Sequence, residues 1–149
     1  MNKLFLIITL ILTADINLFA QSAAIQNGGQ FILKDIKEEV VSDMWTQPPE
    51  GMKFVAFDIL IDNTNGNDKI QLDFDGAAIE IKDSQGYSLP LNFVSYDIVK
   101  PSMKFPADIE KGDLLRGWIT VAIRKESPLN TLRIRIKTNT QSGWIVIKK

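Results

Sequence analysis

Residues 53–63, with the sequence KFVAFDILIDN, decide the fold class of this protein. Every second position is apolar, so one side of the segment is entirely hydrophobic: Val55, Phe57, Ile59 and Ile61. The other side is mixed, because it carries Asp58 and Asp62 beside further apolar residues. One apolar side and one mixed side are typical of a half-buried strand in an antiparallel sheet.

The same alternation recurs along most of the chain, between turns that are rich in Gly, Asp and Asn. Seven further segments are expected to be strands: 31–36, 70–74, 78–82, 87–93, 114–124, 131–137 and 144–147. No segment shows the apolar repeat of a helix, and 42–51 and 95–113 are expected to be long irregular loops. Because short strands without intervening helices build sandwiches or barrels, we predict an all-β antiparallel sandwich of about seven or eight strands.

The composition narrows the chemistry that this chain can perform. Its 149 residues include 17 Lys and Arg, 18 Asp and Glu, no Cys and no His. The chain therefore lacks disulfides, thiol nucleophiles, Ser-His-Asp triads and the usual zinc ligands. We expect no enzyme, no catalytic residue, no metal and no other cofactor. A net charge of -1 gives no general attraction to nucleic acid, so we expect no such partner.

The N-terminal residues have the features of a secretory leader. Lys3 gives a positive start, residues 4–14 are apolar or nearly so, and Asp15 interrupts them. This run is shorter than the roughly 20 residues that span a bilayer, so it predicts a signal peptide over 1–20. The mature protein would then be secreted or periplasmic.

The domain boundaries follow from this leader. Cleavage is expected after Ala20 or, alternatively, after Ala24. We expect 21–28 to be a short flexible N-terminus and 29–149 to be one folded domain. No Cys follows the apolar run to accept a lipid, so no stable membrane anchor is expected after cleavage.

Three segments resemble those of a bacterial extracellular family with an immunoglobulin-like sandwich. Residues 51–63, which run from a Gly through alternating apolar residues to an Asn, are similar to one strand of the family. Residues 109–121 are similar to a second strand, which contains two glycines. Residues 74–86 are similar to its hairpin, with matches at Ile79, Ile81, Asp83 and Gly86. Family members often follow a signal peptide or a lipoprotein anchor, and most have no known function. A secreted mycobacterial immunogenic protein shares the fold. The resemblance implies an immunoglobulin-like sandwich and carries no catalytic residue.

Aromatic residues in the two predicted loops form a first candidate binding site. These residues are Trp45, Tyr96 and Phe105. Exposed aromatic side chains on loops contact proteins or sugars. The structural alternative is that the rings fold back and cover the ends of the core.

Cations on the late strands form a second candidate binding site. Arg133 and Arg135 are predicted to point outward from the segment 131–137. If that segment pairs with 114–124, they form a stripe with three further cations: Arg116, Arg124 and Lys137. Such a stripe could hold an anionic glycan, a phosphate or an acidic protein. The alternative is an exposed sheet face whose charges prevent aggregation.

A calcium site is a weaker expectation. Asp73-Phe-Asp75-Gly76 begins like an EF-hand loop, but position 12 holds Ser84 instead of an acidic ligand, which favours a hairpin turn. A site of another type stays open because six aspartates surround the same strands: Asp58, Asp62, Asp68, Asp73, Asp75 and Asp83.

These observations favour a secreted or periplasmic immunoglobulin-like module that binds a protein or a glycan of the cell envelope. The alternative is a structural or chaperone-like envelope protein that accepts a partner's strand at a free sheet edge. A pocket with two close carboxylates would instead indicate a hydrolase.

Overall fold

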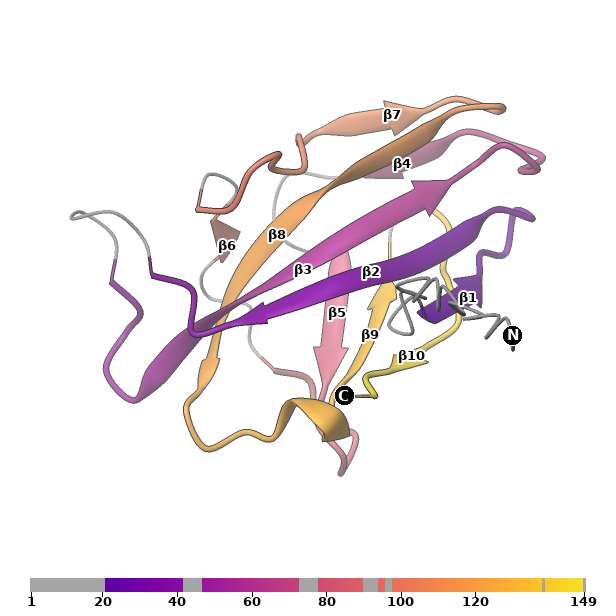
Figure 1. Ribbon diagram of the computed structural model, residues 1–149. Helices are drawn as coiled ribbons and strands as arrows, with labels where there is room; N and C mark the ends of the chain where they lie inside the picture. Colours follow the sequence, from indigo (N-terminus) through magenta and orange to yellow (C-terminus); the bar gives the residue numbers. More distant parts are fainter. Residues whose placement is uncertain are drawn as a thin grey trace, which may run out of the picture.

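The chain folds into two β-layers, as the computed structural model in Figure 1 shows. The structure describes residues 21–41, 47–72, 78–89, 94–95, 98–137 and 139–148. Within these ranges no helix has the length and hydrophobicity needed to cross a membrane. The strands that follow pair antiparallel throughout, which confirms the predicted all-β antiparallel sandwich.

The larger layer is a five-stranded sheet in the order β1-β2-β3-β8-β6. Its strands are β1 (Gln21–Ala24), β2 (Gln30–Glu38), β3 (Met52–Asp62), β8 (Leu114–Arg124) and β6 (Val94–Ser95). β3 and β8 lie at its centre and pair over their full lengths, with Met52 opposite Arg124 and Asp62 opposite Leu114. β3 coincides within one residue with the segment on which the fold prediction rests.

The smaller layer is a three-stranded sheet in the order β10-β9-β5. Its strands are β5 (Ile79–Lys82), β9 (Arg133–Ile136) and β10 (Ile145–Val146), and a 3-10 turn, η1 (Leu129–Thr131), precedes β9. A separate antiparallel pair joins β4 (Ile70–Leu72) to β7 (Ala107–Ile109). In Figure 1 the small sheet lies behind the large one, and β4 and β7 run along the upper side.

The core fills the space between the two sheets. The inner side of β3, predicted from the alternation, is fully buried, with Val55, Phe57 and Ile59 at 0% exposure. The small sheet faces it with the alternate residues of β5 and β9: Ile79, Ile81, Ile134 and Ile136. Burial of such a side chain contributes about 1.5–3 kcal/mol, so this interior supplies the main stabilisation of a domain without disulfides.

The centre of the large sheet is buried on its outer side as well. Its outward residues on β3 and β8 are nearly inaccessible: Phe54, Ala56, Asp58, Trp118, Thr120 and Ala122. Asp58 is compensated by Arg116, which donates from Nε (3.1 Å) and Nη2 (2.6 Å), and this contact raises the pKa of Arg116. The Lys37 ammonium lies 4.6 Å from the centre of the Trp118 ring. The Thr120 hydroxyl is buried and has no hydrogen-bond partner among the residues that the structure describes.

Gly117 allows a second segment to approach β8 closely. The Met103 amide donates to the Trp118 carbonyl (3.0 Å), and the Trp118 amide donates to the Pro101 carbonyl (2.8 Å). A Cβ atom on Gly117 would overlap the Met103 backbone, so this close approach requires a glycine. Met103 is itself buried in the core, although it lies in a predicted irregular loop.

A single buried asparagine ties three turns together at one end of the sandwich. The Asn63 side-chain nitrogen donates to the carbonyls of Asp68, Ile109 and Glu110, each at 3.0 Å. Its side-chain oxygen accepts a hydrogen bond from the Asn27 amide, also at 3.0 Å. A side chain on Gly66 would overlap the Asn63 amide, so this turn requires a glycine there.

Three predictions about secondary structure need correction. Residues 21–24, predicted to be flexible, form β1, because their backbone pairs with β2 and the Ala24 carbonyl accepts from Gly143 (2.8 Å). Residues 107–109 form β7 inside the predicted loop 95–113, because β4 supplies their partner. The segment 131–137 begins with a 3-10 turn, and only its part from Arg133 to Ile136 is a strand.

Candidate functional site

The predicted basic stripe does not form across two paired strands. β8, with Arg116 and Arg124, belongs to the large sheet, whereas β9, with Arg133 and Arg135, belongs to the small sheet. The stripe prediction is therefore wrong, because alternation shows which side a residue faces but not which strands pair. Arg116 is instead engaged with Asp58.

The outer face of the small sheet gathers a different set of cations. Glu80 and Lys82 of β5 stand opposite Arg135 and Arg133 of β9, and all four point away from the core. Lys137 continues the alternation of β9, and Lys148 lies two residues after Val146, which pairs with Arg133. We call this surface the basic face, and its charged residues are Glu80, Lys82, Arg133, Arg135, Lys137 and Lys148. Five cations thus accompany one carboxylate.

Trp144 lies on the basic face, directly before the edge strand β10. The Arg135 guanidinium is 4.4 Å from the centre of the Trp144 ring, and the Lys82 ammonium is 5.2 Å away. Contacts of this kind between cations and aromatic rings contribute about 0.5–1 kcal/mol at exposed sites and more where water is excluded. They hold two long side chains against the sheet, so these charges are already ordered before any ligand arrives.

Glu80, on the same face of the small sheet, forms ion pairs with the same two cations. Its carboxylate accepts from Arg135 Nε (2.9 Å) and Nη2 (2.7 Å), and its other oxygen lies 3.5 Å from the Lys82 ammonium. Burial acts to raise the pKa of Glu80, but the hydrogen bonds and charge of Arg135 and Lys82 outweigh burial, so the pKa lies below its usual value. Glu80 stays ionised and neutralises one of the five positive charges.

A hollow adjoins the basic face where β1 meets β10. It has a volume of about 450 Å³ and is lined by Gln21, Ser22, Trp144, Ile145, Val146 and Lys148. We call it the seam hollow. The two strands are joined there by a hydrogen bond from Gly143 to Ala24 (2.8 Å), and the Gln26 amide donates to Gln141 just beyond it (2.9 Å). Trp144 and Lys148 line the hollow and also belong to the basic face.

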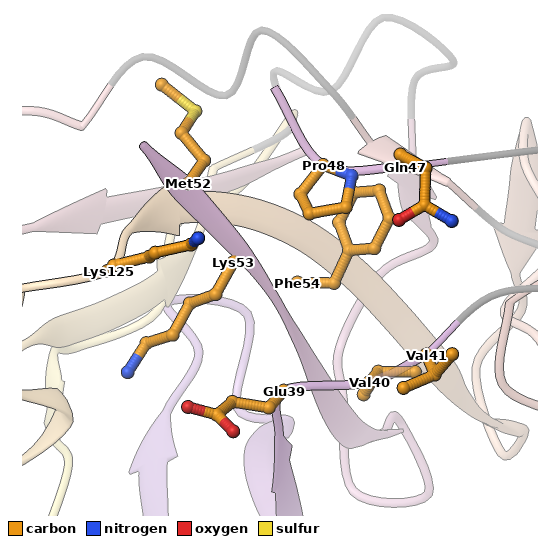
Figure 2. A pocket seen from close by; sticks show the side chains of 9 residues that line it. All are labelled: Glu39, Val40, Val41, Gln47, Pro48, Met52, Lys53, Phe54 and Lys125. Carbon is orange, nitrogen blue, oxygen red and sulfur yellow. The ribbon is translucent and has the colours of Figure 1, made fainter. Parts of the chain in front are cut away.

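A second hollow lies at the N-terminal end of β3, as Figure 2 shows. Its volume is about 370 Å³, and its floor is Phe54, which is almost fully buried. Figure 2 shows Pro48, Val40 and Val41 on one side, and the charged side chains of Glu39, Lys53 and Lys125 on the other. The charges at its rim are mixed, since Lys53 also lies 3.4 Å from Glu38. This hollow therefore has no net preference for an anionic or a cationic ligand.

The three loop aromatics have different outcomes. Trp45 and Tyr96 lie outside the described residues. Phe105 is half-buried and packs against the core, so it contributes to stability as the structural alternative expects. Phe105 lies two residues before β7, whereas Arg133 and Arg135 lie on β9 of the small sheet.

The aspartates considered for calcium have other partners where the structure describes them. Asp58 pairs with Arg116, Asp62 accepts from Thr64, and Asp83 accepts from the backbone of its own turn. Asp73 and Asp75 lie outside the described residues. In the described part of the chain, no three acidic side chains gather where they could hold a metal ion.

The sheet edge that strand addition would need is poorly suited to it. β1 covers β2 only from Gln30 to Leu33, and no described strand pairs with the same edge beyond that point. Four of the five residues 34–38 are charged, and the register with β3 shifts between Leu33 and Asp35. Charges and bulges on an edge strand oppose pairing with another chain.

The sequence analysis missed four members of the basic face: Glu80, Lys82, Trp144 and Lys148. Alternation in 78–82 already indicated that Glu80 and Lys82 face outward. What was lacking was the pairing of β5 with β9, which joins segments about fifty residues apart and follows from tertiary structure.

Comparisons with known proteins place the chain in a family. Among solved structures, it is similar to a candidate lipoprotein, YcdA, from Bacillus subtilis, with 10% identity over 88% of this chain and a TM-score of 0.57. This chain spans 39% of the length of that protein. A conserved hypothetical protein from Bacillus anthracis matches at 15% identity over 84% of this chain and 97% of its own, with a TM-score of 0.48.

The likeness to YcdA shows a shared fold and nothing more, because the identity is low. No curated protein matches the chain significantly. The family model for a domain of unknown function, DUF4352, matches residues 22–143, which is most of the chain and includes β1 through the turn before β10. The protein therefore belongs to the DUF4352 family.

Proposed function

We propose that this protein is an extracytoplasmic, immunoglobulin-like binding module whose basic face holds an anionic polymer of the cell envelope. One observation carries the proposal. Among the residues that the structure describes, five cations and a single carboxylate share one open sheet face, in a chain whose net charge is only -1. A local concentration of positive charge on a nearly neutral protein attracts polyanions to that face.

The shape of the basic face favours an extended ligand. Arg133, Arg135 and Lys137 follow one another at every second residue, which spaces successive side chains about 7 Å apart. Arg133 and Lys137 are exposed, and the surface is an open sheet face. A row of charges on an open surface suits repeated anionic groups better than one small molecule. The guanidinium groups can bind carboxylate, sulfate or phosphate groups through paired hydrogen bonds.

Two observations support a location outside the cytoplasm. The sequence predicts a secretory leader over residues 1–20. The Bacillus subtilis protein with the same fold is a candidate lipoprotein, and lipoproteins are attached to the cell envelope. An anionic envelope polymer is a ligand that a protein in this location would meet.

Retention on immobilised heparin tests the proposal. We expect the protein comprising residues 21–149 to bind heparin at low salt and to elute as the salt concentration rises, because charge contacts are screened. The double variant Arg133→Glu, Lys137→Glu should lose about tenfold in affinity, which corresponds to about 1.4 kcal/mol.

A matched control separates the basic face from net charge. Lys104→Glu with Lys111→Glu makes the same change in charge at exposed positions outside the small sheet, and it should bind heparin nearly as well as the wild type. Equal losses in the two double variants would refute a localised site. Tighter binding to duplex DNA than to a polyuronate at the same salt would point to a different class of partner and overturn the proposal.

A further inference from the structure

We propose that cleavage between Ala20 and Gln21 completes the anion-binding site, because the new α-ammonium group of Gln21 then joins the seam hollow. This inference rests on the proposed function and deepens it. Hydrolysis adds water across the peptide bond, leaving a carboxylate on Ala20 of the leader and an α-ammonium group on Gln21. A neutral peptide nitrogen thus becomes a positive charge beside the basic face.

The position of the cut follows from the role of β1. All four residues of β1 pair with β2, from Gln21 opposite Leu33 to Ala24 opposite Gln30. Ala23 packs against the core, and the Ala24 carbonyl accepts a hydrogen bond from Gly143. Cleavage after Ala24 would remove this strand and open the connection between the two sheets. Cleavage after Ala20 leaves the pairing of β1 with β2 intact.

The placement of Gln21 makes its α-ammonium group part of the site. Gln21 lines the seam hollow together with Trp144, Val146 and Lys148. In the orientation that matches donors to acceptors, its side-chain nitrogen donates to the Val146 carbonyl (2.8 Å) and its oxygen accepts from the Lys148 amide (3.1 Å). These bonds hold the first residue of the mature chain against β10. An anionic group in the hollow would then meet two ammonium groups, of Gln21 and Lys148.

The first test is the mass of the mature protein exported by the cell that makes it. We expect a chain that begins at Gln21. A chain that begins at Ile25, or one that retains the leader, would overturn the inference. So would a chain lighter by one ammonia, because a cyclised Gln21 has lost its α-ammonium group.

The second test compares the free and the acetylated α-amino group on the 21–149 protein. An α-amino group has a pKa of about 7.7–8.0 and lysine of about 10.4, so acylation near pH 6.5 selects the N-terminus. We expect acetylation to weaken heparin binding about two- to fivefold and to reduce the salt dependence by about one ionic contact. Cyclisation of Gln21 with loss of ammonia would remove the same charge, so the comparison uses protein whose mass shows an uncyclised Gln21.

The outcomes separate this inference from the proposed function. Identical salt dependence of the free and acetylated proteins, with both bound to heparin, overturns the inference alone. Failure of both forms to bind heparin overturns the proposed function and the inference with it. A parallel fall in melting temperature on acetylation would assign the lost affinity to damaged folding, which also counts against the inference.

Discussion

The outer faces of the two sheets differ sharply, although both sheets pack an apolar inner face on the same core. On β3 and β8 the outward residues Phe54, Ala56 and Ala122 are almost as buried as the inward ones. On β5 and β9 the outward residues are all charged: Glu80, Lys82, Arg133 and Arg135. The large sheet therefore contributes to stability on both sides, whereas the outer side of the small sheet carries charged side chains.

The two strand sequences already express this difference. In β3 the residues from Phe54 to Ile59 are buried without a break, which is typical of a strand covered on both faces. In β9 the sequence RIRI alternates strictly between exposed or half-buried Arg and buried Ile. Strict alternation with charges thus marks the sheet face on which a ligand can be sought.

The sharpest test of this comparison is a pair of outward substitutions, one on each sheet. Phe54→Ala should reduce the free energy of unfolding by about 3–5 kcal/mol, because it removes a buried ring and leaves a cavity. Arg133→Ala on the basic face should change it by less than about 0.5 kcal/mol. Urea denaturation of both variants measures the difference, and similar losses in the two would show that the outer faces are equivalent.

A second prediction concerns the ion pairs that Glu80 forms with Arg135 and Lys82. Glu80→Gln should reduce the free energy of unfolding by about 1–2 kcal/mol at pH 7, because it removes a half-buried carboxylate that holds two cations. Heparin binding should be retained or strengthened, since the basic face gains a positive charge. Lower stability together with weaker heparin binding would mean that the ordering of Arg135 by Glu80 matters more than charge.

The same pair predicts a pH dependence. The pKa of Glu80 in the folded protein lies below its ordinary value of 4.5, so the pair stabilises the fold fully above that value. This contribution is lost as the pH falls through the lowered pKa. The stability difference between the wild type and Glu80→Gln should therefore be constant near neutrality and shrink below about pH 4.5. Urea titrations at several pH values would show a constant difference down to pH 3 if the prediction is wrong.

The smallest expected effect is a gain in stability on the outer face of the large sheet. The Thr120 hydroxyl is buried there and finds no hydrogen-bond partner in the described part of the chain, and an unpaired buried hydroxyl costs free energy. Thr120→Val keeps the shape and removes the polar group, so it should raise the free energy of unfolding by about 1 kcal/mol. Thr120→Ser retains the hydroxyl and serves as the control. A loss of stability in the valine variant would show that the hydroxyl is satisfied in solution.

Sequence reasoning located strands well where side chains alternate strongly. The central strands β3 and β8 are found almost to the residue, because their inner faces carry bulky apolar side chains at every second position. β1 was missed because its sequence, QSAA, has little hydrophobic contrast, and its backbone is held mainly by β2 and Gly143. A strand stabilised by its partners leaves no local signal.

The candidate site was predicted in part. Arg133 and Arg135 face outward as expected, because alternation fixes the side of a strand. Arg116 and Arg124 were expected beside them, but these residues lie on β8. The separation of β8 and β9 into different sheets depends on contacts between residues distant in the sequence. Trp144 was not among the candidate residues, although its contacts with Arg135 and Lys82 hold both cations against the sheet.

The amide of Asn63 has a practical consequence for protein engineering. Because this one side chain bonds to the carbonyls of Asp68, Ile109 and Glu110, the lengths of the turns it joins are coupled. A peptide grafted between Asn63 and Asp68 would displace all of them at once. Residues 84 and 85 at the tip of the next hairpin are exposed, so foreign epitopes should be displayed there, provided that Gly86 is kept, because its φ of +87° favours glycine.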